Sequence, residues 1–243
     1  MWVIFSKEIR SFFNSSIAFA TISFFMILIG ICVWVYPNYN ILDSGYAEMT
    51  FFFKISPYIF CFLIPSISMG MISEENKNGT MELLLTSSLS IRSIVLGKYF
   101  AIMSIVGSII LISLTYVITI FLISFPQGNI DLAGICGSYI GLFLLSSAFA
   151  AIGIFASACS STQITAFVIG SIICISLYSA FELFSILQSF NKISFYVQQL
   201  GLQFHYEAIS KGLINLQNVI FFVIISGIFI FLTEDKVKKI QTK

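Results

Sequence analysis

Long segments without charged side chains constrain the fold of this chain most. The longest, residues 132–181, contains no Asp, Glu, Lys or Arg. A membrane-spanning helix needs about 20 mostly apolar residues, so this stretch is too long for one span and long enough for two. Six segments of span length follow along the chain, at approximately 16–36, 51–72, 96–125, 133–158, 163–187 and 216–233.

The composition agrees with a membrane as the solvent. Of the 243 residues, 58% are hydrophobic and 9% are charged, whereas about 25% of the residues of a soluble domain are charged. The net charge of +1 argues against a nucleic-acid partner. We therefore expect an all-α integral membrane protein whose residues 1–243 form one transmembrane domain with six transmembrane helices.

The basic residues predict the orientation. Six spans place both termini on the same side as residues 73–95 and 157–163, and that side holds nine of the 12 Lys and Arg residues. The other side holds the remaining three: Lys54, Lys192 and Lys211. By the positive-inside rule, both termini and the 73–95 loop are expected in the cytoplasm.

The N-terminal residues 1–13 mix aromatic side chains with Lys7, Glu8 and Arg10. This mixture is typical of a helix that lies in the plane of the lipid headgroups.

Of the outer segments, 37–50, 126–132 and 188–215, the last has a helical pattern. Leu202, Tyr206, Ile209 and Leu213 recur on one face, while Glu207 and Lys211 form an i,i+4 pair on another. We expect an amphipathic outer hairpin that rests on or dips into the outer leaflet, with His205 on its solvated face.

The loop at 73–95 is unusually rich in charge and in helix signals. Gly79 suits the left-handed stop of a helix, Thr80 can cap a short helix that carries Glu82 near its positive end, and Ser90 can cap the next span. The three leucines at 83–85 form an apolar patch. Two interpretations remain: an ordinary polar loop, or a docking helix for a soluble partner with Glu74, Glu75 and Glu82 on its rim.

Catalytic signals are weak. The sequence Gly97–Lys98–Tyr99 departs from an ATP-binding P-loop, because Arg92 replaces the first glycine and Tyr99 replaces Ser or Thr. His205 is the lone histidine, so one chain cannot form a metal site of several histidines. Glu182 near the outer end of a span is interpreted as an acid that reaches the interface. No cofactor, metal or catalytic residue is predicted.

Ala133, Gly137 and Gly141 form a ladder of small residues that lets another helix approach closely. The neighbour can belong to the same chain or to a second copy, and the spacing does not decide between them.

Residues 74–86 read E-E-N-K-N-G-T-M-E-L-L-L-T and precede I-V-L-G-K-Y at 94–99. This pattern resembles the cytoplasmic loop of ABC-2 type permeases, the membrane subunits of ATP-driven exporters. Segments 7–19, 62–75, 126–145, 151–167 and 205–222 are most similar to the gliding-motility-associated permease subunit (GldF type). The resemblance covers the whole chain.

The resemblance implies a six-helix permease with an N-terminal interfacial helix, a coupling helix between spans two and three, and an outer hairpin before span six. It also implies a separate ABC ATPase subunit, a second membrane subunit, a dimer of permease domains and a place in the bacterial inner membrane. By position, the coupling region comprises Glu74, Glu75, Lys77, Gly79, Thr80, Glu82, Leu84 and Leu85. The outer hairpin comprises His205, Tyr206, Glu207, Lys211 and Gly212.

Two functions from different classes are compatible with these residues. The first is export of a substrate, driven by the ATPase. The second is a non-transporting anchor that transmits ATPase cycles to an extracytoplasmic machine. A transporter needs a polar or lateral pathway at the dimer seam, and an anchor does not.

Overall fold

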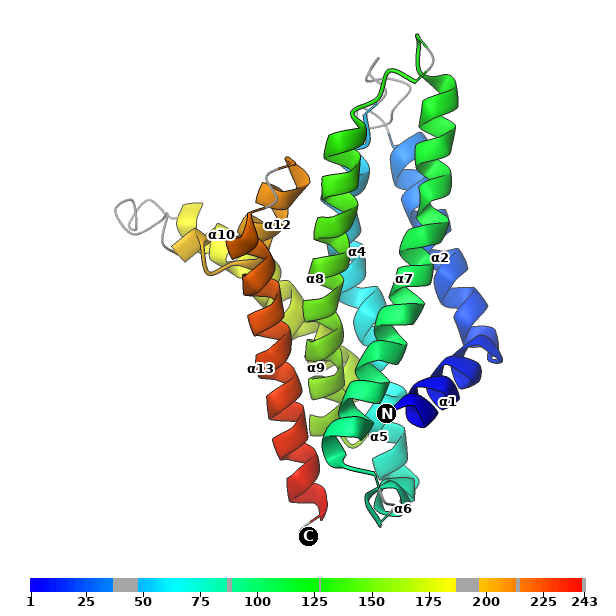
Figure 1. Ribbon diagram of the computed structural model, residues 1–243, viewed down its shortest axis with the longest axis vertical. Coiled ribbons are helices and arrows are strands. Elements are labelled where there is room, and N and C mark those ends of the chain that lie inside the picture. Colours follow the sequence, from blue (N-terminus) through cyan, green and yellow to red (C-terminus); the bar gives the residue numbers. More distant parts are fainter. Residues whose placement is uncertain (37–47, 87–88, 127, 187–196, 213–214, 242–243) are drawn as a thin grey trace.

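The structure is a computed structural model that describes residues 1–36, 48–86, 89–126, 128–186, 197–212 and 215–241 (Figure 1). Within these ranges every regular element is a helix, which agrees with the all-α expectation. The elements are α1 (Trp2–Phe13), α2 (Ser16–Trp34), α4 (Thr50–Ser68), α5 (Gly70–Lys77), α6 (Thr80–Thr86), α7 (Ile91–Ile123), α8 (Leu132–Cys159), α9 (Gln163–Ile175), η1 (Ser176–Ala180), α10 (Phe181–Ile186), α12 (Leu202–Ser210) and α13 (Leu216–Gln241).

Five helical segments among the described residues are long and apolar enough to cross a membrane. They are Thr50–Lys77, Ile91–Ile123, Leu132–Cys159, Gln163–Leu183 and Leu216–Ile240, and they confirm the second to sixth predicted spans. The first predicted span corresponds to α2, which qualifies only together with α1; the two helices are bent by 68° relative to each other. The chain is therefore a multi-pass membrane protein with five spans, or six when this bent pair counts as one.

The helix α8 lies at the centre of the bundle. It packs against α4, α7, α9, α12 and α13, and small residues allow the close approach. A Cβ atom on Gly153 would overlap the hydroxyl of Ser68 on α4, and one on Gly170 of α9 would meet Pro65. By contrast, α13 and α7 expose rows of large apolar side chains, as surfaces in contact with lipid do.

Polar side chains mark the predicted helix starts. Ser90 accepts a hydrogen bond from the Ser93 amide at the start of α7, and Thr162 accepts one from the Thr165 amide at the start of α9. Asp131 caps α8 through the Gly134 amide at 3.0 Å. Each cap satisfies an amide that has no partner within its own helix. The prediction for Ser90 is confirmed.

A break separates α4 from α5 at Met69, one turn after Pro65. Ser157 of α8 spans this break: its hydroxyl donates to the Met69 carbonyl at 2.8 Å and accepts from the Ile72 and Ser73 amides at 3.0 Å each. α5 then ends at Gly79, whose φ of 69° lies in the left-handed region, as the sequence predicted.

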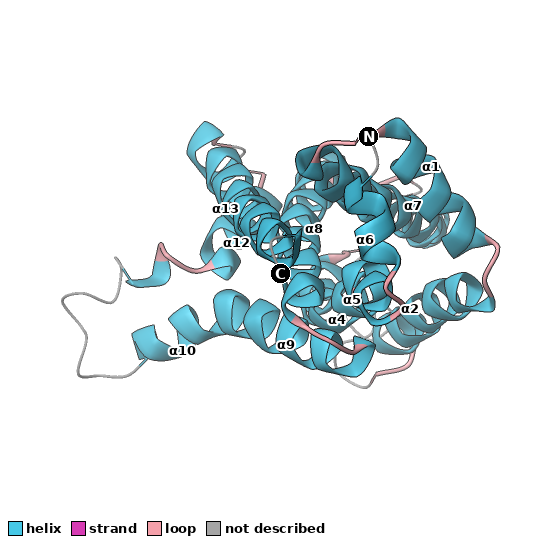
Figure 2. Cartoon of the chain, turned by 90° about the horizontal axis from the view of Figure 1, so that it is seen from below, coloured by secondary structure: helices cyan, strands magenta, loops and turns pink. Residues whose placement is uncertain are grey.

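The two ends of the bundle differ. At one end, which we call the α6 end, lie α5, α6 and the C-terminus; α1 lies across the outside of α7 nearby (Figures 1 and 2). The connection from α7 to α8 lies at the opposite end, which we call the far end. The path from α9 through η1 to α10 leaves the bundle sideways (Figure 2), and α12 returns to pack on α8.

Candidate functional site

The short helix α6 sits at the α6 end and presents both apolar and acidic side chains. Its Leu83 side chain is 72% exposed and Glu82 is exposed, while Met81 is buried and Leu84 is half-buried against the core. One face of α6 therefore holds the helix in place and the other faces outward. Leu85 belongs to α6, but its side chain lies outside the described part of the structure.

A cluster of four charged groups lies where α1, α5 and α7 meet, and α5 leads from it into α6. The Lys98 ammonium contacts Glu8 at 2.8 Å and Glu75 at 2.9 Å, and it donates to the Met71 carbonyl at 2.7 Å. Lys7 contacts Glu75 at 3.1 Å and lies 3.7 Å from Glu8. We call Lys7, Glu8, Glu75 and Lys98 the ionic junction.

The positive and negative charges of the ionic junction are equal in number. Lys98, whose side chain is fully buried, donates hydrogen bonds to Glu8 and to the Met71 carbonyl and forms an ion pair with Glu75 Oε2, an oxygen that accepts no hydrogen bond. Burial lowers the pKa of Lys7, but the hydrogen bond and the negative charge of Glu75, followed by Glu8, hold that pKa above its usual value. The two cations and two anions cancel, which reduces the cost of placing them next to apolar helices.

Close backbone contact brings α1 to this position. Gly97, next to Lys98, lies against the first turn of α1, and a Cβ atom there would stand 3.0 Å from the Met1 carbonyl oxygen and 3.1 Å from Cβ of Ile4. Gly97 and Lys98 therefore have structural roles in joining α1 to α7.

Two further polar contacts tie the α6 end together. Glu74 of α5 accepts a hydrogen bond from the side-chain amide of Gln163, the first residue of α9. Arg92 of α7 lies 3.8 Å from Glu234 of α13. With the ionic junction, these contacts connect α5 and α7 to α1, α9 and α13.

The predicted coupling residues separate into two groups. Glu74, Lys77, Gly79, Thr80 and Glu82 are exposed, whereas Glu75 is 9% exposed. The expectation that Glu75 lies on an exposed rim is wrong, because its carboxylate faces Lys98 and Lys7. Its partners Glu8 and Lys98 were not predicted from the sequence, although a lysine within an apolar helix itself signals that a counter-charge is near.

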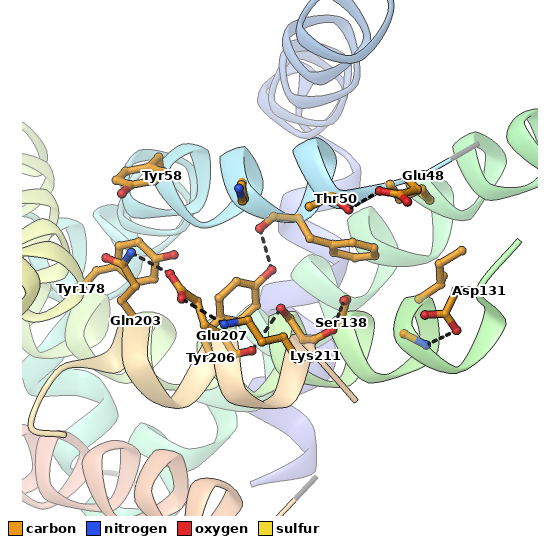
Figure 3. Close-up of a pocket in the computed structure, with 16 residues that line it drawn as sticks. Glu48, Thr50, Tyr58, Asp131, Ser138, Tyr178, Gln203, Tyr206, Glu207 and Lys211 are labelled. Atoms are coloured by element: carbon orange, nitrogen blue, oxygen red, sulfur yellow. Dashed lines mark hydrogen bonds and ion pairs between the residues drawn. The ribbon is translucent and has the colours of Figure 1, made fainter. Parts of the chain in front are cut away.

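The second candidate site is a cleft of about 630 Å³ between α4, α8, η1 and α12 (Figure 3). Its walls combine aromatic side chains with charged groups of both signs. The aromatic residues are Phe53, Tyr58, Tyr178 and Tyr206, and the charged residues are Glu48, Lys54, Asp131, Glu207 and Lys211.

Hydrogen bonds fix the wall that α12 contributes to the cleft. The Tyr206 hydroxyl donates to the Phe53 carbonyl of α4 at 2.7 Å, and the Ser138 hydroxyl of α8 donates to the Ser210 carbonyl at 3.0 Å. Burial raises the pKa of Tyr206 above its usual value, and the negative charge of Glu207 raises that pKa further. The Tyr206 hydroxyl therefore stays protonated and remains a hydrogen-bond donor. These bonds tie α12 to both neighbouring helices.

Charged side chains of α12 reach into the cleft from this wall. Glu207 accepts from the Gln203 side chain at 3.0 Å and lies 4.0 Å from Lys211, which confirms the predicted i,i+4 pair. The Oε1 atom of Gln203 is buried without a hydrogen-bond partner. Gly212, which ends the helix, has a φ of 82°.

The predicted apolar face of α12 is correct, but its partner is not lipid. Leu202, Tyr206 and Ile209 are each at most 2% exposed because they face α8 and its neighbours. The interpretation of this face as resting on the outer leaflet is therefore wrong for the described residues. Leu213 lies outside them.

His205 is buried, in contrast to the solvated position that was expected. Its side chain is 5% exposed and stacks on Phe221 of α13, with ring centroids 3.9 Å apart. The two ring nitrogens lie 2.8 Å from the Asn218 side chain and from the Gln199 carbonyl oxygen. His205 thus joins α12 to the first turns of α13.

The ladder of small residues on α8 packs within the same chain. A Cβ atom on Gly137 would stand 3.0 Å from the Ile209 carbonyl oxygen, and one on Gly141 would stand 3.2 Å from the Ile209 side chain. These glycines therefore accommodate α12 and not a second copy. Ala133, one turn earlier, is exposed.

Among the described residues, no group of three or more His, Cys, Asp or Glu side chains is arranged to hold a metal ion. Glu182 lines a smaller pocket of about 90 Å³ that shares Tyr178, Gln203 and Glu207 with the cleft.

A comparison with protein-family models matches residues 2–234 to the family described as ABC-2 family transporter protein. No curated protein matches the chain. The family match covers nearly the whole chain, and the apolar helices described above are those of a multi-pass membrane protein. The chain therefore belongs to the ABC-2 family and is a transmembrane, permease-type component of an ABC transporter.

Proposed function

We propose that this chain is the permease subunit of an ATP-driven ABC exporter and that a separate ATPase subunit binds it at α6. The observation that carries this proposal is the side-chain arrangement of α6, in which Leu83 is 72% exposed while Met81 is buried. An apolar anchor beside an acidic rim suits docking of a helix into a groove. In this role α6 is the coupling helix, and ATP hydrolysis takes place in the partner.

The ionic junction supports the transmission of force from α6. α5 leads directly into α6 and is held through Glu75 to α1 and α7. A rigid connection lets a displacement of α6 reach several helices at once, instead of being absorbed within a loop. We propose that α1 lies in the headgroup plane and moves with α5 and α7.

The distribution of charge supports an orientation with both termini in the cytoplasm of a bacterial inner membrane. With six spans, nine of the 12 basic residues of the sequence are expected on the same side of the membrane as the 73–95 loop. The resemblance of the sequence to gliding-motility-associated permeases supports a role in gliding or cell-surface secretion, with a second membrane subunit and a dimer of permease domains.

The cleft favours transport over a purely mechanical anchor. A transporter needs a polar, laterally placed pathway, and the cleft offers about 630 Å³ lined by charged and aromatic groups. A rigid anchor needs no such space.

Two adjacent leucines provide a matched test of the docking surface. Leu83→Ser removes an exposed anchor, so we expect the amount of ATPase subunit recovered with the permease to fall at least tenfold, which corresponds to about 1.4 kcal/mol or more. Leu84→Ser removes a half-buried side chain, and we expect it to lower the thermal stability of the permease more than it lowers ATPase recovery. The measurement is pull-down from detergent-solubilised membranes, normalised to the permease level. Undiminished recovery with a normally inserted Leu83→Ser variant would disprove docking through α6.

A further inference from the structure

The cleft presents its chemical groups in a fixed order along α4 and α8. Glu48 and Asp131 precede the first turns of α4 and α8, Lys54 lies about one turn into α4, and Tyr58 lies one turn deeper. Figure 3 shows Glu48 and Asp131 at one end of the cleft and Tyr58 and Tyr178 at the other. From the far end inward, the side chains that α4 and α8 contribute therefore change from anionic through cationic to aromatic, while Glu207 of α12 adds a carboxylate near the aromatic end.

Helix length places this order relative to the bilayer. α8 has 28 residues, which corresponds to about 42 Å at 1.5 Å per residue. A bilayer with its headgroups is about 40–45 Å thick. The first turns of α8 and the neighbouring turns of α4 thus lie at the level of the lipid headgroups, and the tyrosine end of the cleft lies nearer the hydrocarbon.

The balance of charge in the cleft favours a ligand that carries both signs. The lining contains three carboxylates and two ammonium groups, and one carboxylate, Glu207, already lies 4.0 Å from Lys211. Within the described residues, Lys54 belongs to no ion pair. Glu48 accepts a hydrogen bond from the Thr50 hydroxyl at 3.3 Å and Asp131 accepts one from the Gly134 amide, but within the described residues neither carboxylate is paired with a cation, so both can still meet an ammonium group.

The aromatic end of the cleft suits apolar atoms. Tyr58 is 44% exposed and packs edge-to-face on the buried Tyr178, with ring centroids 5.2 Å apart. Tyrosine rings commonly lie at the boundary between headgroups and acyl chains, where one end is apolar and the other is wet.

We propose that this cleft binds the headgroup of an aminophospholipid, with a phosphate and an ammonium group, taken from the leaflet at the far end. The ammonium group meets Glu48 and Asp131, the phosphate meets Lys54, and the upper part of the acyl chains contacts Tyr58. The cleft volume is within the range of about 300–1,000 Å³ that is usual for small-molecule sites. Binding here does not depend on the ATPase partnership proposed above.

The test measures lipid binding to the full chain in detergent by native mass spectrometry. The probes are dioctanoyl phosphatidylethanolamine, dioctanoyl phosphatidylglycerol, which lacks the ammonium group, and glycerophosphoethanolamine, which lacks the acyl chains. We expect phosphatidylethanolamine to bind at least tenfold more tightly than either of the others. Phosphatidylglycerol lacks the charge-assisted contact of the ammonium group, and glycerophosphoethanolamine lacks the acyl carbons that would be buried.

Two variants separate the roles of the two charged groups. Glu48→Gln with Asp131→Asn removes both outer carboxylates but keeps the α8 cap, since asparagine caps as well as aspartate. This double variant is expected to weaken phosphatidylethanolamine binding roughly tenfold and to leave phosphatidylglycerol binding no weaker. Lys54→Gln is expected to weaken binding of both lipids, because both carry the phosphate.

A matched control lies at the α6 end. Asp235 is 44% exposed and pairs with Lys238 on its own helix, so Asp235→Asn removes an exposed acid outside the cleft and should change none of the affinities.

If the double variant weakens binding of both lipids equally, or of neither, the assignment of the ammonium group to Glu48 and Asp131 is overturned. Unchanged binding in Lys54→Gln overturns the phosphate assignment. Equal affinity for glycerophosphoethanolamine and phosphatidylethanolamine overturns the proposal that the ligand is a lipid taken from the bilayer.

Discussion

Lys98 is a charged residue near the start of the long apolar helix α7, and the structure accounts for its presence. Its ammonium group meets Glu8, Glu75 and the Met71 carbonyl at 2.7–2.9 Å. Removing one member of a buried ion pair leaves the other charges uncompensated, which typically costs about 3–5 kcal/mol. Lys7 touches the same carboxylates but is 58% exposed, so water can replace it.

We therefore predict that Lys98→Met destabilises the protein by about 3–5 kcal/mol, whereas Lys7→Met costs less than about 1 kcal/mol. Thermal unfolding of the detergent-purified chain compares the two variants. Adding Glu75→Gln to Lys98→Met should restore part of the loss, because it removes one uncompensated carboxylate. Equal effects of the two lysine variants would contradict the role of the ionic junction.

Single residues were the least predictable part of the site. Glu75 and His205 were both expected at the surface, and both are buried. The sequence shows that each residue is polar, but burial depends on which helices pack there. Glu75 needs α1 and α7 around it, and His205 needs Phe221 and Asn218 of α13. These partners belong to other helices, 13 or more residues away in sequence, and carry no local signal.

At the scale of elements, α12 depends on two glycines of α8. The Ile209 carbonyl oxygen would stand 3.0 Å from a Cβ atom on Gly137. Because this oxygen belongs to the backbone of α12, the helix as a whole must move to make room.

We predict that Gly137→Val displaces α12 and costs about 1–3 kcal/mol. The result should appear as faster hydrogen exchange of residues 202–210. Gly227→Val provides the control, because a Cβ atom on Gly227 of α13 meets no atom within 4 Å. Slow exchange in the Gly137→Val variant, equal to that of the control, would show that the contact does not hold α12.

The elements themselves were largely predictable. The spans follow from apolar length, and the start of α7 and the end of α5 follow from Ser90 and Gly79, whose chemistry acts locally. The apolar face of α12 was also correct, but its partner was not. A periodicity of leucine and tyrosine shows that a face is buried, and it cannot distinguish a lipid surface from the glycine surface of α8.

At the scale of the whole molecule, the two sites lie toward opposite ends of the same central helix. Ser157 near the last turn of α8 holds the break between α4 and α5, and Gly137 near its first turns holds α12. α4 runs between the two sites as well: it leads into α5 at one end and lines the cleft at the other. A displacement of α6 therefore has a continuous path through α5 and α4 to the cleft.

The central claim is that nucleotide turnover in a separate ATPase rearranges this chain through α6. Hydrogen exchange of the permease, measured in lipid nanodiscs with its ATPase subunit, tests it most directly by comparing ADP with ATP trapped by vanadate. We predict altered exchange at residues 80–86, where the ATPase is proposed to bind, and also at residues 202–210, beside the cleft. Altered exchange at residues 80–86 alone, or unaltered exchange at both, would contradict it.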